Sequence, residues 1–157
     1  MEESFDDCIA CLLTSGRLPP PGGRIHRTTY WIVEHCVGAL GVGALIVKPE
    51  RHVLHVADLI DGEAAELGPL LRDAARVTTA LTSPEQVYVS LWSHAGGEPG
   101  HIHYVVQPIT RVVMDEFGYG PRVHVEMFAA DRPLDLDAVG VFAEEARRLF
   151  AARARLA

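Results

Sequence analysis

Gly100-His101-Ile102-His103-Tyr104-Val105-Val106-Gln107-Pro108 is the stretch of sequence that decides the fold. Its β-branched and aromatic residues, between a glycine and a proline, predict a β-strand. Because side chains alternate along a strand, one face carries His101, His103, Val105 and Gln107, and the other carries Ile102, Tyr104 and Val106. We expect the apolar face to pack on a core and the two imidazoles to lie about 7 Å apart on the opposite face. Polar pairs also occur on solvated sheet faces, so this pair alone leaves its role open.

Length and composition favour one ordinary globular domain, residues 1–157. Hydrophobic residues make up 48% of the chain and charged residues 22%, which gives no signature of disorder. The net charge of −7 makes an electrostatic grip on nucleic acid unfavourable. We therefore expect a small-molecule partner and no nucleic-acid partner.

The chain shows no apolar run long enough to span a membrane, and its N-terminus is acidic where a signal peptide would be basic. We therefore expect no membrane association. Three cysteines, two of them paired as Cys8-x-x-Cys11, fit metal or redox use better than a disulfide framework. This pattern indicates the reducing cytoplasm.

Apolar periodicity and turn residues divide the chain into segments of an α+β fold. Strands are predicted at residues 25–28, 30–37, 44–47, 86–92 and 101–107, and helices at 5–14, 61–82 and 137–153. Loops are predicted at 19–23 and 38–43, which are rich in proline or glycine. The Gly68-Pro69 pair is expected to weaken or bend the first turns of the central helix. The short turn between the last two strands makes them antiparallel neighbours, which excludes a doubly wound parallel sheet.

The Cys8 and Cys11 spacing allows two thiolates to bind one Zn²⁺. His52, His55 and His101 are the candidates for the two further ligands. A closed Cys₂His₂ tetrahedron leaves no position for substrate, so such a zinc would be structural. From spacing alone the alternatives stay open, namely two small buried core cysteines or a redox pair, although the βαβ context of a redox motif is missing.

Several segments in order resemble the histidine-triad (HIT) family: GALIVKPERHV at residues 43–53, ADL at 57–59, a helix rich in Ala, Glu and Leu, and a glycine-rich turn into His101-Ile102-His103. The resemblance covers residues 8–108, so residues 1–23 would be a zinc knuckle and loop, and residues 109–157 an unmatched C-terminal extension. It implies a five-stranded antiparallel sheet, a homodimer, and hydrolysis or transfer of nucleotidyl groups from phosphoramidates, dinucleoside polyphosphates or related nucleotide conjugates.

The resemblance also assigns roles to individual residues. It implies zinc ligands Cys8, Cys11, His52 and His101, and it makes His103 the nucleophile that forms a covalent nucleotidyl-histidine intermediate. A neutral imidazole near its ordinary pKa of about 6.5 suits that step, because it can attack phosphorus and later leave. A backbone carbonyl on its other ring nitrogen would fix the tautomer.

The chain departs from the family pattern where the third histidine of the triad would lie, because that position is Val105. Valine cannot donate a hydrogen bond to phosphate or to a leaving group. Gln107 on the same strand face is one substitute, and Ser93 and His94 in the preceding turn are candidate catalytic donors. The backbone N–H groups of Gly96 and Gly97 could bind an anion. For Ser93 and His94 a plain turn role is an equal alternative.

The ribose-binding acid of the family is also missing, and Glu34 or His35 could take its place. Trp31 and Trp92 are candidate substrate contacts; Trp31 either stacks on a base or fills the core. Arg51 is expected to pair with an acidic residue at the surface.

Three functions remain compatible with these residues. The first is a nucleotidyl hydrolase or transferase acting through His103. The second is a non-catalytic, zinc-structured module that binds a nucleotide or phosphorylated metabolite. The third is a specialised pathway enzyme that uses the same pocket on a non-nucleotide substrate.

Overall fold

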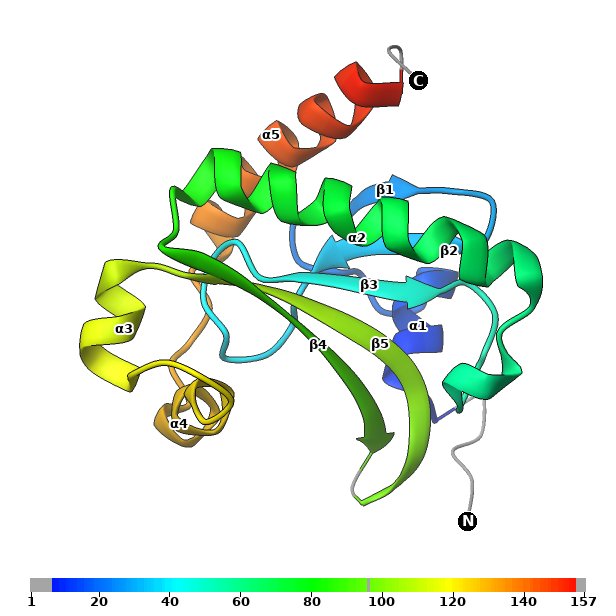
Figure 1. Ribbon diagram of the computed structural model, residues 1–157, viewed down its shortest axis with the longest axis horizontal. Helices are drawn as coiled ribbons and strands as arrows, with labels where there is room; N and C mark the ends of the chain where they lie inside the picture. The colour runs from blue at the N-terminus through cyan, green and yellow to red at the C-terminus, as the bar shows by residue number, and fades with distance from the viewer. Residues whose placement is uncertain (1–6, 96, 155–157) are drawn as a thin grey trace.

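A five-stranded antiparallel sheet organises the chain (Figure 1). The computed structural model describes residues 7–95 and 97–154. In spatial order the strands are β1 (Arg24–Arg27), β2 (Trp31–His35), β3 (Leu45–Pro49), β5 (Glu98–Ile109) and β4 (Gln86–Ala95). The predicted α+β class and the antiparallel pairing of the last two strands are confirmed.

The helices predicted at residues 61–82 and 137–153 are present with nearly those bounds, whereas the helix predicted at residues 5–14 begins at residue 9. Residues 5 and 6 of that prediction lie outside the described residues. The three helices are α1 (Ile9–Ser15), α2 (Asp61–Thr82) and α5 (Leu136–Ala154), and a short 3₁₀ turn, η1 (Val56–Asp58), precedes α2. Pro69 lies inside α2, which is assigned as helix without a break from Asp61 to Thr82. Proline therefore removes one backbone hydrogen bond there without ending the helix.

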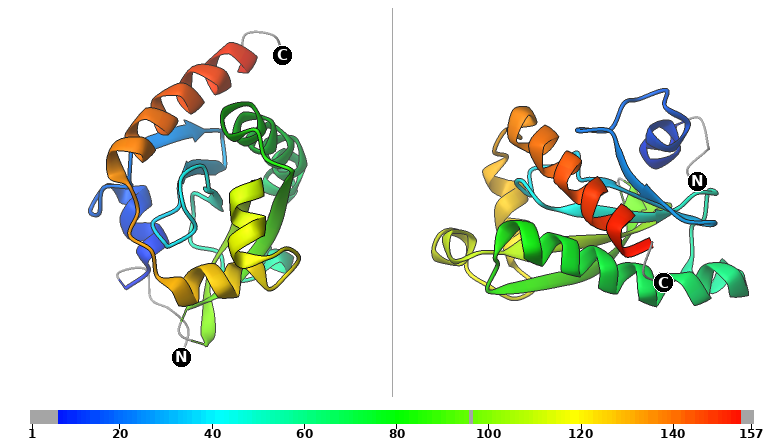
Figure 2. Two further views of the ribbon diagram at one scale, coloured as in Figure 1. Left: turned by 90° about the vertical axis from the view of Figure 1, so that its left-hand side faces the viewer. Right: turned by 90° about the horizontal axis from the view of Figure 1, so that it is seen from above.

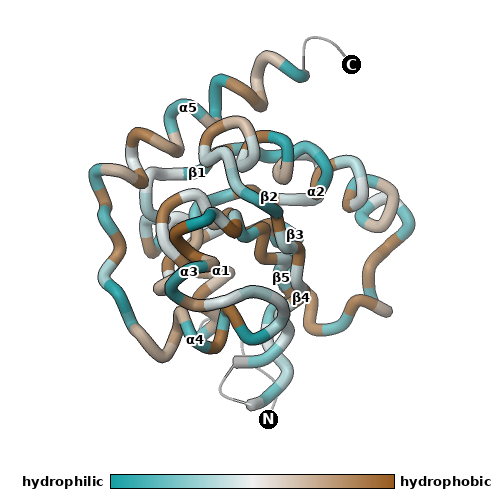
Figure 3. The backbone as a smooth tube through the Cα atoms, turned by 60° about the vertical axis from the view of Figure 1, so that its left-hand side comes forward, coloured by the Kyte–Doolittle hydropathy of each residue, from teal (hydrophilic) through white to brown (hydrophobic). Residues whose placement is uncertain are grey.

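Helices α2 and α5 cover one face of the sheet, and α5 runs beside α2 (Figure 2). Hydrophobic and hydrophilic residues alternate along α5, as expected for a helix with one buried side (Figure 3). The residues buried on this face form what we call the first core, which includes Trp31, Val33, Leu45, Val47, Leu70, Ala74, Val77, Val106, Phe142, Ala143 and Ala146.

Two further helices, α3 (Arg111–Phe117) and α4 (Val123–Ala130), were not predicted from the sequence. Both lie in the C-terminal extension, and each is eight residues or shorter, which leaves too few turns for a clear periodic pattern. Residues of α4 pack on the other face of the sheet. The second core, as we call it, consists of Cys36, Leu40, Ala44, Val105, Ile109, Val123 and Met127.

The second core corrects the expectation that only the face of the quoted strand with Ile102, Tyr104 and Val106 packs on a core. Val106 packs in the first core and Val105 in the second, so β5 is covered on both faces. His101 is buried and Gln107 is fully buried. The alternation of side chains was predicted correctly, but the partner helix for the second face was not.

Gly43 fixes the approach of the loop before β3 to the end of α2. Its φ is +97°, and a Cβ placed there would lie 2.7 Å from Thr82 Cγ2. Only glycine adopts this conformation in this space without displacement.

Candidate metal centre and candidate active site

Helix α1 presents the two cysteines of the C-x-x-C pair to the end of β5. Cys8 is the N-cap of the helix, and its Sγ accepts a hydrogen bond from the backbone N–H of Cys11 at 3.4 Å. The helix ends at Gly16, whose φ of +77° is typical of a C-cap. Both thiols are buried and are not joined in a disulfide.

Four potential ligand atoms converge at this point. The ligand atoms of Cys8, Cys11, His52 and His101 all lie within 4.8 Å of one another. The Sγ atom of Cys11 is 3.2 Å from Nδ1 of His52 and 3.4 Å from Nδ1 of His101, and Cys8 Sγ is 3.6 Å from Nδ1 of His101. Sulfur and nitrogen ligands at the corners of a zinc tetrahedron are about 3.6 Å apart, so the cluster has the dimensions of such a site.

The histidine rings are oriented for ligation by one nitrogen. Nε2 of His101 lies 3.1 Å from the carbonyl oxygen of Pro49, which assigns the proton to Nε2 and leaves the Nδ1 lone pair directed at the sulfurs. Burial lowers the pKa of His101 to about 3, so the ring is neutral. Of the two candidates from the K-P-E-R-H segment, the cluster contains His52, whereas His55 is exposed beside η1.

The donor set fits a metal ion. Two thiolates and two neutral imidazoles are the ligands of a structural zinc site. Without a metal, these buried polar atoms would lie close together with little to stabilise them. Such an ion would link α1, the segment after β3 and the start of β5 through its coordination bonds.

His103 lies two residues beyond the cluster on β5. Its Nδ1 is 3.0 Å from the carbonyl oxygen of His101, so Nδ1–H donates and Nε2 is the unprotonated ring nitrogen. The carbonyl partner expected from the sequence is thus present. The ring is half-buried, and its centroid is 5.9 Å from that of Trp92, the opposite residue on β4.

A hollow of about 190 Å³ opens beside His103 on the face of the sheet away from α2. Its lining is mainly apolar and comes from α1, β2, β3, β4, β5 and α4. It includes Ile9, Ala10, Leu13, Glu34, Cys36, Ile46, Lys48, Trp92, His103 and Phe128.

One charged pair, which the sequence reasoning did not single out as a pair, lies in this lining. Lys48 Nζ donates to Glu34 Oε1 and, at 2.8 Å, to the carbonyl oxygen of Ala10. Both side chains are 1% exposed. Burial lowers the pKa of Lys48, and the charge of Glu34 opposes that effect. A lysine in place of an apolar residue on the buried β3 strand was the available signal.

The position of the third triad histidine is a core position in this chain. Val105 is fully buried in the second core. Gln107, further along β5, donates through Nε2 to the carbonyl oxygens of Leu40 and Pro108, each at 3.1 Å, and does not line the hollow.

The two tryptophans lie in different places. Trp92 lines the hollow, and its ring also contacts those of His124 and Phe128 on α4. Trp31 packs in the first core on the opposite face, where Nε1 donates to the carbonyl oxygen of Glu63 at 3.0 Å. The structure therefore brings Trp92, and not Trp31, to His103.

None of the described residues from Ser93 to Gly100 lines the hollow. The pairing of the two strands shifts register between Trp92 and His94, so Ser93 lies at an irregular position of β4, and His94 is exposed. Gly97 adopts a φ of +93°. Gly96 lies outside the described residues.

His35 borders the hollow, but its ring is engaged within the protein. Nδ1 donates to the carbonyl oxygen of Cys36 at 2.8 Å, and Nε2 accepts from the N–H of Gly43 at 2.9 Å. The ring also meets Phe142 of α5 edge-on. The expected acidic partner of Arg51 is Glu63, which binds its guanidinium through both carboxylate oxygens.

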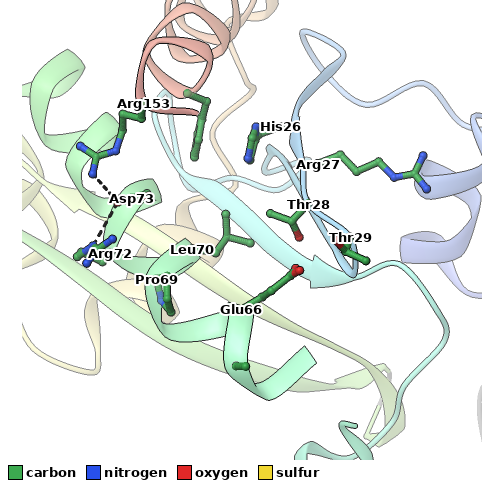
Figure 4. A pocket seen from close by; sticks show the side chains of 12 residues that line it. His26, Arg27, Thr28, Thr29, Glu66, Pro69, Leu70, Arg72, Asp73 and Arg153 are labelled. Atoms are coloured by element: carbon green, nitrogen blue, oxygen red, sulfur yellow. Dashed lines mark hydrogen bonds and ion pairs between the residues drawn. The ribbon is translucent and has the colours of Figure 1, made fainter. Parts of the chain in front are cut away.

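A second hollow of about 640 Å³ lies on the α2 and α5 side (Figure 4). His26 lines it and stacks on Phe150 with ring centroids 4.5 Å apart. Two of its arginines, Arg72 and Arg153, pair with Asp73. None of the metal-cluster residues or His103 lines this hollow.

Comparison with solved structures identifies the fold. No family model matches the chain, and no curated protein matches it. A zinc-bound histidine triad family protein from Mycobacterium smegmatis superposes with a TM-score of 0.68 at 16% identity, over 98% of this chain and 100% of that one. A hypothetical histidine triad nucleotide-binding protein from Sulfolobus tokodaii gives 0.68 at 12% identity, over 92% and 93%. A HIT family member from Bacillus subtilis gives 0.62 at 18% identity, over 95% and 96%. Architecture, strand order and these likenesses together show that the chain has the α+β fold of histidine-triad proteins.

Proposed function

We propose that this protein is a divergent histidine-triad protein that hydrolyses or transfers a nucleotidyl group through a covalent intermediate on His103. The observation that supports the proposal is the hydrogen bond from His103 Nδ1–H to the carbonyl oxygen of His101, which makes Nε2 the unprotonated ring nitrogen of a residue that lines a mainly apolar hollow. A small nucleotide conjugate or a related phosphorylated metabolite is the substrate class.

In the proposed reaction Nε2 of His103 attacks the α-phosphorus, and the new N–P bond forms as the bond to the leaving group breaks. Water then attacks phosphorus, the N–P bond breaks, and a proton from that water passes to solvent. Val105 has no proton for the leaving group, and Ser93 and His94 do not line the hollow, so that proton comes from the substrate or from water. We expect slow turnover for this reason.

We propose that Cys8, Cys11, His52 and His101 hold one structural Zn²⁺ per chain. The match between their spacing and a tetrahedral site supports this assignment. Metal analysis of the folded protein tests it, and well under one zinc per chain would contradict it. Because the thiols must stay reduced, we place the protein in the cytoplasm.

We propose a homodimer formed through α2 and the edge of the sheet. Strand β4 is an edge strand, and Val89 and Leu91 on the side of α2 are 45% and 42% exposed.

None of the helices in the described part of the chain combines the length and the hydrophobicity needed to span a bilayer.

The test of the catalytic proposal is intact-protein mass spectrometry after mixing with nucleoside phosphoramidates and dinucleoside polyphosphates. We expect the protein mass to rise by one nucleotidyl group, and we expect no such rise in the folded His103→Ala variant. A His103→Ala variant as active as the parent would eliminate the covalent mechanism.

A non-catalytic binding module is the second candidate function. The burial of Val105 in the second core favours it, because an apolar core residue that cannot donate a proton to a leaving group occupies the position of the third triad histidine. Saturable nucleotide binding by the parent with neither adduct nor turnover would establish this alternative.

A further inference from the structure

We infer that Glu34 selects the ligand of the His103 hollow by accepting a hydrogen bond from a neutral N–H or O–H group of that ligand, and that Lys48 positions Glu34 for this contact. The inference rests on the proposed function in one respect only, namely that the hollow beside His103 receives the ligand. It adds a chemical requirement that the fold itself does not impose.

The free oxygen of Glu34 carries the inference. Glu34 Oε1 binds Lys48, whereas Oε2 is buried and has no hydrogen-bond partner among the described residues. Glu34 lines the hollow and is 1% exposed. A buried acceptor without a hydrogen-bond partner destabilises a protein, and a charged acceptor does so more strongly. A hydrogen-bond donor on the ligand would offset this cost.

Lys48 fixes the direction in which that oxygen points. Its ammonium binds Glu34 Oε1 on one side and the carbonyl oxygen of Ala10 in α1 on the other. The ammonium is thus held between the helix backbone and one carboxylate oxygen of Glu34. The second carboxylate oxygen is left without a partner among the described residues.

The charges of the pair decide which donor fits. Lys48 and Glu34 offset each other, so a neutral hydroxyl, amide or amine meets the oxygen without adding net charge to the hollow. A cation would lose its hydration in apolar surroundings, and a carboxylate or phosphate would face the free oxygen directly. The remaining lining, including Ile46, Trp92 and Phe128, suits a flat apolar group that carries this donor.

Three nucleotides that differ in their donors test the inference on the intact protein. They are adenosine 5′-monophosphate, its 2′,3′-dideoxy analogue without sugar hydroxyls, and purine riboside 5′-monophosphate without the exocyclic amine. Binding is followed by the NMR signal of the Trp92 indole N–H, and the signal of Trp31, which packs on the other face, is the internal control.

We expect removal of one of the two donor types to weaken binding to the parent about ten- to a hundredfold, the usual value of a hydrogen bond to a charged group. The arm that weakens identifies the donor as sugar hydroxyl or base amine. Glu34→Gln should bind the same nucleotides with that difference reduced. Because Glu34→Gln leaves Lys48 buried without a counter-charge and keeps an amide oxygen as an acceptor, the second variant is Glu34→Leu/Lys48→Met, which removes both the charges and the acceptor and should fold and show no difference.

Equal binding of all three nucleotides by the parent, or an unchanged difference in the double variant, would overturn the role of Glu34. If the parent binds none of the three nucleotides, the proposed nucleotide function fails. The inference is then tested separately by comparing the binding of phenol, which has an O–H donor, with that of anisole, which has none. Phenol should shift the Trp92 signal at lower concentration than anisole in the parent but not in the double variant. Equal effects, or no effect of either compound, would refute the selection by Glu34.

Discussion

Replacing His101 and His103 one at a time by alanine should separate the structural centre from the chemical one. The two residues lie two positions apart on β5, yet their surroundings differ. His101 is buried, belongs to the metal cluster and donates to Pro49 O. His103 is half-buried beside the hollow and donates to His101 O. We expect His101→Ala to damage both stability and turnover, and His103→Ala to abolish turnover with only a small loss of stability.

The sizes of the two effects follow from these contacts. Truncation of a buried ring costs about 3–5 kcal/mol, and His101→Ala would also leave the carbonyl oxygen of Pro49 without a donor. At about 2–4 °C per kcal/mol for a chain of this length, the melting temperature should fall by about 10 °C or more before any contribution from the metal. His103→Ala loses the hydrogen bond to the carbonyl oxygen of His101, worth about 1 kcal/mol, and this loss corresponds to a fall of about 2–4 °C.

Thermal unfolding with and without a zinc chelator is the assay. The parent and His103→Ala should both lose stability when the chelator is added, because the metal binds the folded state far more tightly than the unfolded one. His101→Ala should show a much smaller response, since its site is already incomplete. Nucleotidyl adduct formation, measured on the same samples, supplies the chemical readout.

Two results would refute this reasoning. An equal fall in melting temperature for both variants would show that the cluster does not distinguish the two histidines. A chelator effect in His101→Ala as large as in the parent would show that His101 is not a ligand of the bound metal.

Three further predictions concern stability and assembly. The free energy of unfolding should fall as the pH is lowered from 7 to 5, because burial lowers the pKa of His35, so the unfolded chain binds a proton that the folded chain does not. In His35→Gln the free energy of unfolding, measured with urea, should depend less steeply on pH, by at most about 1.4 kcal/mol per pH unit. Gly43→Ala should cost about 1–3 kcal/mol, because its new Cβ would lie 2.7 Å from Thr82 Cγ2 at a φ of +97°; an unchanged melting temperature would contradict the strain argument. Val89→Lys with Leu91→Lys should convert the proposed dimer to a monomer in light scattering, whereas a parent that already scatters as a 17.1 kDa particle would reject the dimer.

The sequence predicted those parts of the molecule that depend on local periodicity and spacing. The twenty-two residues of α2 carry a long apolar stripe, and their predicted bounds match the observed ones. The C-x-x-C spacing indicated the two cysteines of the metal cluster, whereas the choice of His52 and His101 came from the family resemblance, because spacing alone left His55 open as well. The tautomer of His103 followed from the general behaviour of imidazole beside a strand carbonyl.

Features that arise from long-range packing could not be predicted in the same way. The contact of Phe128 with the hollow depends on where the extension folds back, and no local pattern in α4 encodes that path. The pairing of Lys48 with Glu34 depends on the alignment of β2 with β3. Glu34 was considered only as a ribose-binding acid, because its buried partner lies fourteen residues away.

Helix α1 has only seven residues, a length at which an isolated helix is not stable in water. It nevertheless provides Ile9 and Leu13 to one wall of the hollow and the carbonyl oxygen that anchors Lys48. If zinc holds this helix in place, the amount of zinc in the cell affects ligand binding in the hollow as well as the folding of the chain. A chain that acquires its metal late would pass through a state in which the sheet and His103 are in place while the ligand site is still missing a side.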